Sequence, residues 1–95
     1  MSDLFEALSA PVRRTILDVL SERDGQTLFE ICGGLVMQHH LNLSRQAISQ
    51  HLEVLEAAGL VRTQREGRYK YHFLDTTPLD AIAKRWPRKP PKESK

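Results

Sequence analysis

The segment from Leu43 to Leu74 constrains the fold most, because a helix pattern in it passes directly into a hairpin pattern. Ser44 is a good N-cap, since its hydroxyl can accept a hydrogen bond from a backbone N–H of the first helical turn. Gly59 favours a helix end in the left-handed conformation. The apolar residues between them recur at helical spacing, and they are Ile48, Leu52 and Leu55. We therefore predict one amphipathic helix between Ser44 and Gly59.

A β-hairpin is predicted immediately after this helix. The strand-like runs Leu60–Arg65 and Arg68–Leu74 flank Glu66-Gly67, a two-residue turn in which Gly67 would take a positive φ. Pairing through this turn gives a face that we expect to pack on the helices, with Leu60, Tyr69, Tyr71 and Phe73. The face that we expect to meet an anionic partner carries Thr63, Arg65, Arg68 and Lys70. We also expect His72 to point outward.

Apolar stripes predict two short helices before this segment. The first has a stripe of Leu4, Phe5 and Leu8. The second begins at Pro11, because the fixed φ of proline suits the first helical position, and it ends near Gly25. Its predicted buried face consists of Val12, Ile16, Leu17 and Leu20.

A third helix is predicted from Leu28 to about Met37, and a last one begins at Thr77-Pro78. The buried face of the third helix would be formed by Leu28, Ile31, Leu35 and Val36. Gly33-Gly34 weakens this helix by roughly 1 kcal/mol per glycine relative to alanine, so we expect either a close helix contact there or a break. The last helix carries a stripe of Leu79, Ile82, Ala83 and Trp86.

Four helices, a hairpin and a final helix follow one another in the order of a winged helix-turn-helix. We therefore predict a mostly α fold with a small β-hairpin. The third helix and the helix after Ser44 would form the helix-turn-helix, and the hairpin would form the wing. We expect residues 1–86 to make up this domain, and residues 87–95 to form a flexible basic tail rich in proline and lysine.

The length and composition describe one small soluble domain. A chain of 95 residues buries a modest core, so association with a second copy would help to stabilise it. The one cysteine, Cys32, has no internal disulfide partner, which fits a reducing compartment. No apolar run approaches the roughly 18 residues of a membrane span. The N-terminal MSDLFEAL lacks the layout of a secretory signal. We expect a cytoplasmic protein without membrane contact.

Charge is distributed unevenly along the chain. Through Val61 there are four arginines against eight acidic residues, or −4, and from Arg62 onward ten Lys and Arg against four acidic residues, or +6. Part of this excess lies in the proline-rich tail, where a solvated basic tail is a sufficient explanation. The remainder lies in the patterned region of the hairpin, at Arg62, Arg65, Arg68 and Lys70. This asymmetry predicts an anionic partner for the second half of the chain.

The outward face of the Ser44 helix has the side chains that suit duplex DNA. With the apolar stripe facing inward, the N-terminal turns present Arg45, Gln46, Ser49 and Gln50 to solvent. Arg can donate twice to guanine, and Gln can both donate to and accept from adenine in the major groove. Ser44 could contact the phosphate backbone as well as cap the helix. The hairpin cations could bind phosphates or the adjacent minor groove.

Two other interpretations remain open for these residues. Arg and Gln are good helix formers, so the same face could be an ordinary solvated one. Winged helices also serve as protein-binding or RNA-binding modules without sequence-specific DNA recognition. An enzyme is not expected, because no phosphate-binding glycine loop, paired carboxylates in an apolar setting or nucleophile with an adjacent base is present.

The chain resembles the ArsR-type winged-helix repressors of bacteria over about residues 3–86. The resemblance lies in "ALSAPVRRTILDVL", "SRQAISQHLEVLEAAGLV" and "REGRYKYHFL". It implies a homodimeric repressor that binds a palindromic operator and is released by a signal. In such proteins the first and last helices build the dimer interface, which would here involve Leu4, Phe5, Leu8, Leu79, Ile82 and Trp86. These stripes could alternatively complete the core of a monomer.

Many relatives in this family are metal or metalloid sensors. Their arsenic-type motif has two cysteines separated by one residue on the third helix; here Cys32 matches the first position, but Gly34 stands at the second. Other relatives use Asp and His pairs on the last helix, where this chain has Asp80 and no histidine. One thiolate does not build a thiolate-rich site. We therefore expect no metal and no other cofactor, and the effector stays unidentified.

The remaining histidines and Cys32 allow weaker hypotheses. His39 and His40 could approach Cys32 in a third metal arrangement, although a polar loop is the simpler interpretation. We expect His51 to be half-buried beneath the recognition helix rather than to be a ligand. We expect Cys32 to be a buried, inert thiol rather than a redox switch. The stretch from Gly33 to Asn42 is longer than the usual connection in the family, and this insertion could extend the third helix, form a small effector pocket or contact DNA.

Overall fold

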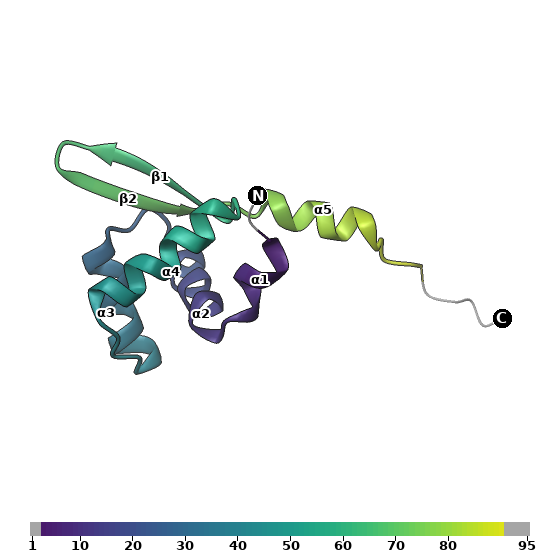
Figure 1. Ribbon diagram of the computed structural model, residues 1–95. Helices are drawn as coiled ribbons and strands as arrows, with labels where there is room; N and C mark the ends of the chain where they lie inside the picture. Colours follow the sequence, from purple (N-terminus) through teal and green to yellow (C-terminus); the bar gives the residue numbers. More distant parts are fainter. Residues whose placement is uncertain (1–2, 91–95) are drawn as a thin grey trace.

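A computed structural model describes residues 3–90 of the chain (Figure 1). Its elements, in chain order, are α1 (Leu4–Ser9), α2 (Pro11–Glu22), α3 (Leu28–His39), α4 (Arg45–Ala57), β1 (Val61–Glu66), β2 (Tyr69–Leu74) and α5 (Thr77–Arg85). The predicted winged helix-turn-helix is confirmed, with α3 and α4 as the helix-turn-helix and the antiparallel β1–β2 hairpin as the wing.

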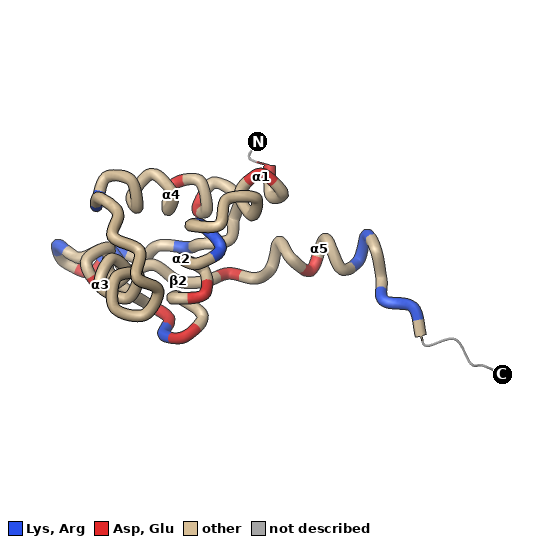
Figure 2. The backbone as a smooth tube through the Cα atoms, turned by 90° about the horizontal axis from the view of Figure 1, so that it is seen from below, with Lys and Arg blue, Asp and Glu red and all other residues tan. Residues whose placement is uncertain are grey.

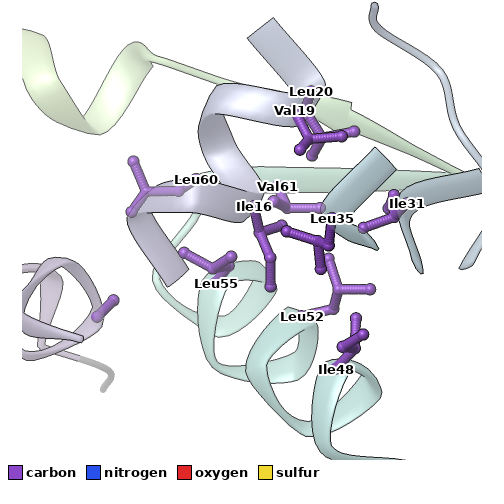
Figure 3. Packing of buried hydrophobic residues seen from close by; sticks show 11 residues of the cluster. Ile16, Val19, Leu20, Ile31, Leu35, Ile48, Leu52, Leu55, Leu60 and Val61 are labelled. Carbon is purple, nitrogen blue, oxygen red and sulfur yellow. The ribbon is translucent and has the colours of Figure 1, made fainter. Parts of the chain in front are cut away.

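The core lies where α2, α3 and α4 meet the base of the wing (Figure 3). Its largest fully buried side chains are Ile16, Leu20, Ile31, Leu35, Ile48, Leu55, Leu60 and Val61. Each helix contributes residues at helical spacing, as its apolar stripe predicts. The prediction that Val36 is buried was wrong, since it is 44% exposed. The buried residues of α3 are Ile31 and Leu35.

Local signals place both ends of α4. The Ser44 hydroxyl accepts a hydrogen bond from the Ala47 backbone N–H at 3.0 Å, so the predicted N-cap is confirmed. Gly59 has a φ of 81°, as predicted for the residue that ends this helix. The Leu60 N–H then donates to the Leu55 carbonyl at 3.0 Å, and the chain enters the wing with Leu60 already buried. This short exit fixes the wing against the C-terminal end of α4.

The two glycines of α3 behave differently, although the helix runs through both of them. A Cβ on Gly34 would lie 3.1 Å from Val19 Cγ1, whereas a Cβ on Gly33 would meet nothing within 4 Å. The expected close helix contact is therefore confirmed at Gly34, and the alternative of a break was wrong. The absence of a side chain at Gly34 lets α3 approach α2 closely.

The stretch from Gly33 to Asn42 mostly extends α3, which continues to His39. Of the three possibilities considered for this stretch, the extension of the third helix is the one that the structure bears out. His40 ends the helix in the left-handed conformation, with a φ of 56°. The next N–H, that of Leu41, donates back to the Leu35 carbonyl at 2.9 Å. The turn to α4 is therefore built by a helix cap rather than by an inserted loop.

The pairing of the wing differs from the prediction by its turn and by its buried face. Glu66 pairs with Tyr69, so the turn is Gly67-Arg68 and lies one residue later than expected. Gly67 has the predicted positive φ, at 61°. The predicted packing face was only partly right, because Leu60 is buried whereas Tyr69 is 55% exposed. The opposite face is the one that packs, and its cross-strand pairs nearest the helices are Val61 with Leu74 and Thr63 with His72.

A third segment explains why His72 is buried. Gln26 bridges to His72 on the free edge of β2, with the Gln26 N–H donating to the His72 carbonyl at 3.0 Å and the His72 N–H donating to the Gln26 carbonyl at 2.7 Å. The His72 ring Nδ1 also lies 2.9 Å from the Gln26 carbonyl oxygen. The prediction that His72 points outward was therefore wrong, since the chain between α2 and α3 holds it inside.

The last helix projects from the body of the molecule (Figure 1). None of its residues is buried, although Ile82 is half-buried. The chain leaves regular structure after Trp86. The predicted tail begins at residue 87, and its residues 91–95 lie outside the described part of the chain.

Candidate nucleic-acid interface

The N-terminal turns of α4 present polar side chains that the fold itself does not use. Arg45, Gln46 and Gln50 are exposed, and Ser49 is half-buried. Ile48 and Leu52 on the inner side of the same helix anchor it in the core. Packing therefore orients these four polar groups outward together, in the arrangement that the sequence predicts.

The tip of the wing carries three exposed cations: Arg65, Arg68 and Lys70. Arg65 and Lys70 are direct cross-strand partners. Like charges placed opposite each other destabilise a hairpin. No ion pair within residues 3–90 involves any of the three. Their mutual repulsion would be relieved by an anion bound against the wing.

A groove of about 280 Å³ joins these two sets of residues. Ser49 and Leu52 of α4 line one side, and Arg68, Tyr69 and Lys70 of the wing line another. The start of α3 contributes further lining at Thr27 and Leu28. The structure therefore brings a residue of the predicted recognition helix and two of the predicted phosphate-binding cations to one surface.

Arg62 is separated from this group. Its Nε lies 3.6 Å from a carboxylate oxygen of Asp75, and its guanidinium lies 5.5 Å from the centre of the Phe73 ring. Both contacts are at the base of the wing, next to the start of α5. Four hairpin cations were predicted to bind DNA. Among residues 3–90, Arg62 differs from the other three because its charge is paired with Asp75 and lies over the Phe73 ring.

Figure 2 shows Lys and Arg at the end of the hairpin and along α5 and the residues just after it, and also on the body of the molecule between these two ends. The N-terminal end of α4 and the tip of the wing project to one end, and the final helix and the chain after it project to the other (Figures 1 and 2). The polar face of α4 and the wing cations therefore belong to one surface, from which the basic end of the chain is remote.

The residues predicted to form a dimer interface lie on α1 and α5. Leu4 and Leu8 are half-buried against the core, whereas Phe5, Leu79 and Trp86 are among the exposed large apolar side chains. The rings of Phe5 and Trp86 lie 6.4 Å apart between centroids. The two stripes are thus adjacent in one protomer, and part of their apolar surface is open to solvent.

Cys32 is a half-buried thiol on α3. Burial raises its pKa above the ordinary value, against the opposing effects of the Arg45 charge and a backbone hydrogen bond. A raised pKa disfavours the thiolate, which is the reactive form of cysteine. Among residues 3–90, no three His, Cys, Asp or Glu side chains are grouped so that they could hold a metal ion. With Gly34 at the second position, the residues present do not fit an arsenic-type thiolate site.

Two structural residues were missed by the sequence-based predictions. Arg13 is buried although it is charged, and its spacing from Ile16 and Leu20 on the same helix face could have indicated this. Gln26 is buried at the bridge to β2, where no periodic pattern marks it. His51 is half-buried, as predicted, and it contacts Arg13.

Across the described residues no helix has the length and apolar character that crossing a bilayer requires.

Comparisons with known proteins agree with this architecture. A family model described as a helix-turn-helix domain matches residues 8–64. The chain is 45% identical over 83 residues to YuzN, an uncharacterized helix-turn-helix-type transcriptional regulator of Bacillus subtilis (strain 168), covering 87% of this chain and 90% of that protein. It is 38% identical over 79 residues to the transcriptional repressor SdpR of the same organism, covering 83% of this chain and 80% of SdpR.

A solved structure gives the same result at the level of the fold. The crystal structure of a possible transcriptional regulator for arsenical resistance matches with a TM-score of 0.73 and 34% sequence identity, covering 88% of this chain and 80% of that one. The proteins similar to this chain are thus named as transcriptional regulators rather than enzymes.

Proposed function

Because the chain belongs to the ArsR-type family of helix-turn-helix transcriptional regulators, we propose that it represses transcription by binding an operator as a homodimer. SdpR, one of its relatives, is named as a repressor, which supports this direction of regulation. The partner would be double-stranded DNA, and the protein would act in the cytoplasm.

One observation supports DNA binding most directly: side-chain donors that have no partner among residues 3–90 face one surface from two elements. Arg45, Gln46 and Gln50 project from the N-terminal turns of α4, and Arg68 and Lys70 lie across the groove from Ser49. Recognition helices contact base edges with their N-terminal residues. The positive end of the α4 dipole adds attraction for phosphate at the same place.

The two sets of residues would have different tasks. Arg45, Gln46 and Gln50 would contact base edges in the major groove and so supply sequence preference. Ser44 and Ser49 would donate to the DNA backbone, which positions the helix without distinguishing sequences. The cations at the wing tip, namely Arg65, Arg68 and Lys70, would neutralise phosphates beside the recognised groove and supply affinity.

A second copy of the chain is the proposed partner of α1 and α5. An isolated amphipathic helix of nine residues is marginal in water, and none of the α5 side chains is buried in one protomer. Covering Leu79, Ile82 and Trp86 together with Leu4, Phe5 and Leu8 would remove this apolar surface from water. Such a dimer would place two α4 helices on half-sites about one turn of DNA apart, so the operator would be palindromic.

Release would follow from a change in this dimer. A signal that binds one dimer geometry more tightly than another shifts the population toward it. A geometry in which the two α4 helices no longer match successive major grooves would have low operator affinity. The chemical nature of that signal is left unassigned.

The proposal is tested by measuring binding to labelled duplexes by fluorescence anisotropy over a series of salt concentrations. A dimer that uses three wing cations per protomer on phosphates should show a log–log salt slope of about −5 on random-sequence DNA. An RNA duplex of matching sequence is the control, because its deep, narrow major groove does not admit a recognition helix. Equal affinity for both duplexes, or binding that is insensitive to salt, would contradict the proposal.

A further inference from the structure

Arg13 is a buried charge that joins three helices. It lies on α2 and is 8% exposed. Its Nε donates to the Ala7 carbonyl at 2.9 Å, and its Nη2 donates to the Glu6 carbonyl at 3.0 Å. Its remaining arm, Nη1, lies 3.2 Å from Nδ1 of His51 on α4. One side chain therefore touches both α1 and the recognition helix.

The contacts on α1 are with two carbonyls near the C-terminal end of that helix. The last four carbonyls of a helix have no intrahelical N–H partner, and a cation near them is favourable. Arg13 donates to those of Glu6 and Ala7; the Glu6 carbonyl also accepts from the Ser9 hydroxyl at 2.7 Å, and the Glu6 carboxylate lies 3.7 Å from the guanidinium. The contacts with α1 therefore fix the position of the guanidinium, and the guanidinium in turn restrains the His51 ring.

Chemistry determines which form of His51 can complete this contact. Arginine has only donors, so its bond to Nδ1 requires that this nitrogen carry no proton. Protonation of His51 would remove the acceptor and place a second positive charge against Arg13. The charged group in contact with the ring is Arg13 on α2, and the Glu6 carboxylate on α1 lies 3.7 Å from the same guanidinium.

The electrostatics favour the neutral ring. Burial lowers the pKa of His51 below its ordinary value of 6.5, and the Arg13 charge lowers it further. A histidine with a lowered pKa makes its full contribution to stability above the ordinary pKa, and that contribution declines as the pH falls toward the lowered value. The contact is therefore favoured at neutral pH and is weakened as the pH falls below 6.5 toward the lowered pKa of His51.

We propose that Arg13 and His51 are positioning residues that hold the recognition helix in a set relation to α1, and that protonation of His51 releases α4 from this relation. Because α1 carries half of the proposed dimer interface, the Arg13–His51 contact would couple a change in dimer geometry to the position of α4 and its DNA-contacting surface. The consequence for DNA rests on the proposed function. It predicts weaker operator binding in mild acid, although the gain of positive charge on histidines by itself would strengthen attraction to DNA.

The coupling is tested first on the free protein, by nuclear magnetic resonance titration of wild type and His51→Asn. Asparagine offers a carbonyl acceptor at the same branch position and does not titrate. In wild type, the backbone amides of Ala7 and Leu8 on α1 should shift with the same midpoint as the His51 ring, below pH 6.5. In His51→Asn these shifts should be absent. His40→Asn, which removes an exposed histidine, should leave them unchanged.

Two results would overturn the coupling. Shifts confined to α4 would mean that His51 titrates without moving α1. Equal shifts of α1 in wild type and His51→Asn would mean that another group causes them. His51→Leu leaves the Arg13 donor without an acceptor, so at pH 7.5 its α1 amides should already have the chemical shifts of the acidified wild type. Chemical shifts like those of wild type at pH 7.5 would also contradict the proposed coupling.

The second measurement is operator affinity over a series of pH values from 7.5 downward. Relative to His51→Asn, wild type should have lost affinity by a factor of about three at half a pH unit below the midpoint of the His51 ring titration, and the loss is limited to about tenfold per pH unit for one proton. If the α1 amides titrate as predicted but neither protein binds DNA at any pH, the proposed function is wrong, whereas the coupling between His51 and α1 through Arg13 is supported. If both bind DNA with the same pH dependence, the positioning role is overturned.

Discussion

At the scale of single residues, two arginines of the same wing illustrate how local partners decide function. Arg62 has an ion-pair partner in Asp75 and lies over the Phe73 ring. Arg68 occupies the turn at the tip and lines the groove that faces Ser49. The sequence around both residues is similarly basic. Of the two, Arg68 is the one that lines the groove beside α4, where the proposed DNA strand would lie. The two residues therefore form a matched pair for experiment.

Arg68→Ala is expected to weaken binding to all duplex sequences by a similar factor, because a phosphate contact carries no sequence information. The log–log salt slope should fall in magnitude by about 1 for each lost contact. Arg62→Ala removes the same charge from the base of the wing and should change the slope much less. Affinity measured over a salt series distinguishes them; an equal loss in both variants would mean that overall charge, rather than the wing tip, governs binding.

Arg45→Ala is expected to relax preference at one base pair by roughly 1–3 kcal/mol, because a bidentate arginine distinguishes guanine from other bases. The measurement is a comparison of affinities for duplexes substituted at each operator position. Lys84→Ala, which removes one positive charge from α5, is the control and should leave the preference intact. A uniform loss across all sequences in Arg45→Ala would assign this residue to phosphate contact instead.

At the scale of elements, the sequence predicted each helix and the wing, because helical spacing and caps are local signals. The N-cap at Ser44 and the left-handed end at Gly59 are confirmed for this reason. The buried face of the wing was predicted wrongly, since it depends on pairing between His72 and Gln26, which lie far apart in the sequence. Tyr69 and Tyr71 on the other face suggested burial, although the tyrosine hydroxyl tolerates partial exposure.

The candidate site was predictable to a similar extent. Arg45, Gln46, Ser49 and Gln50 follow from the inward stripe of one helix, and the structure orients them as expected. Sequence alone did not separate Arg62 from the other wing cations, because its partner Asp75 lies beyond the hairpin. The role of Arg13 likewise depends on contacts with two other helices. Long-range partners thus account for what the local patterns missed.

The paired glycines of α3 give a prediction at this scale. Gly33→Ala should raise the free energy of unfolding by up to about 1 kcal/mol, because alanine is the better helix former and its Cβ would meet nothing within 4 Å. Gly34→Ala should be less stable than Gly33→Ala, since its Cβ would lie 3.1 Å from Val19 Cγ1. Urea denaturation of both variants checks the order. The reverse order would mean that α3 and α2 separate at no cost.

At the scale of the whole molecule, the two ends have different surfaces. The N-terminal end of α4 and the wing tip lie at one end, and α5 projects from the other (Figure 1). Leu79 on α5 and Trp86 directly after it are exposed. In a dimer joined through α1 and α5, both DNA-contacting surfaces would remain uncovered. This division explains how one small domain could use an apolar surface for association and a polar one for DNA.

Trp86→Ser is expected to shift the protein from dimer toward monomer, because it removes a large apolar side chain from the proposed interface. Sedimentation velocity over a range of concentrations measures this shift. Phe29→Ser is the matched control, since Phe29 on α3 is 74% exposed, more than the 59% of Trp86, but lies outside the proposed interface. Loss of the dimer in Phe29→Ser and its retention in Trp86→Ser would place the interface on α3.

We propose that this chain is a dimeric, sequence-specific DNA-binding repressor. The decisive experiment is selection of bound fragments from random duplex DNA by the purified protein at near-physiological salt. We expect recovery of a two-fold symmetric site of roughly 20 base pairs, with half-sites about one helical turn apart. Recovery of fragments that share no sequence, or of a single half-site without symmetry, would contradict it.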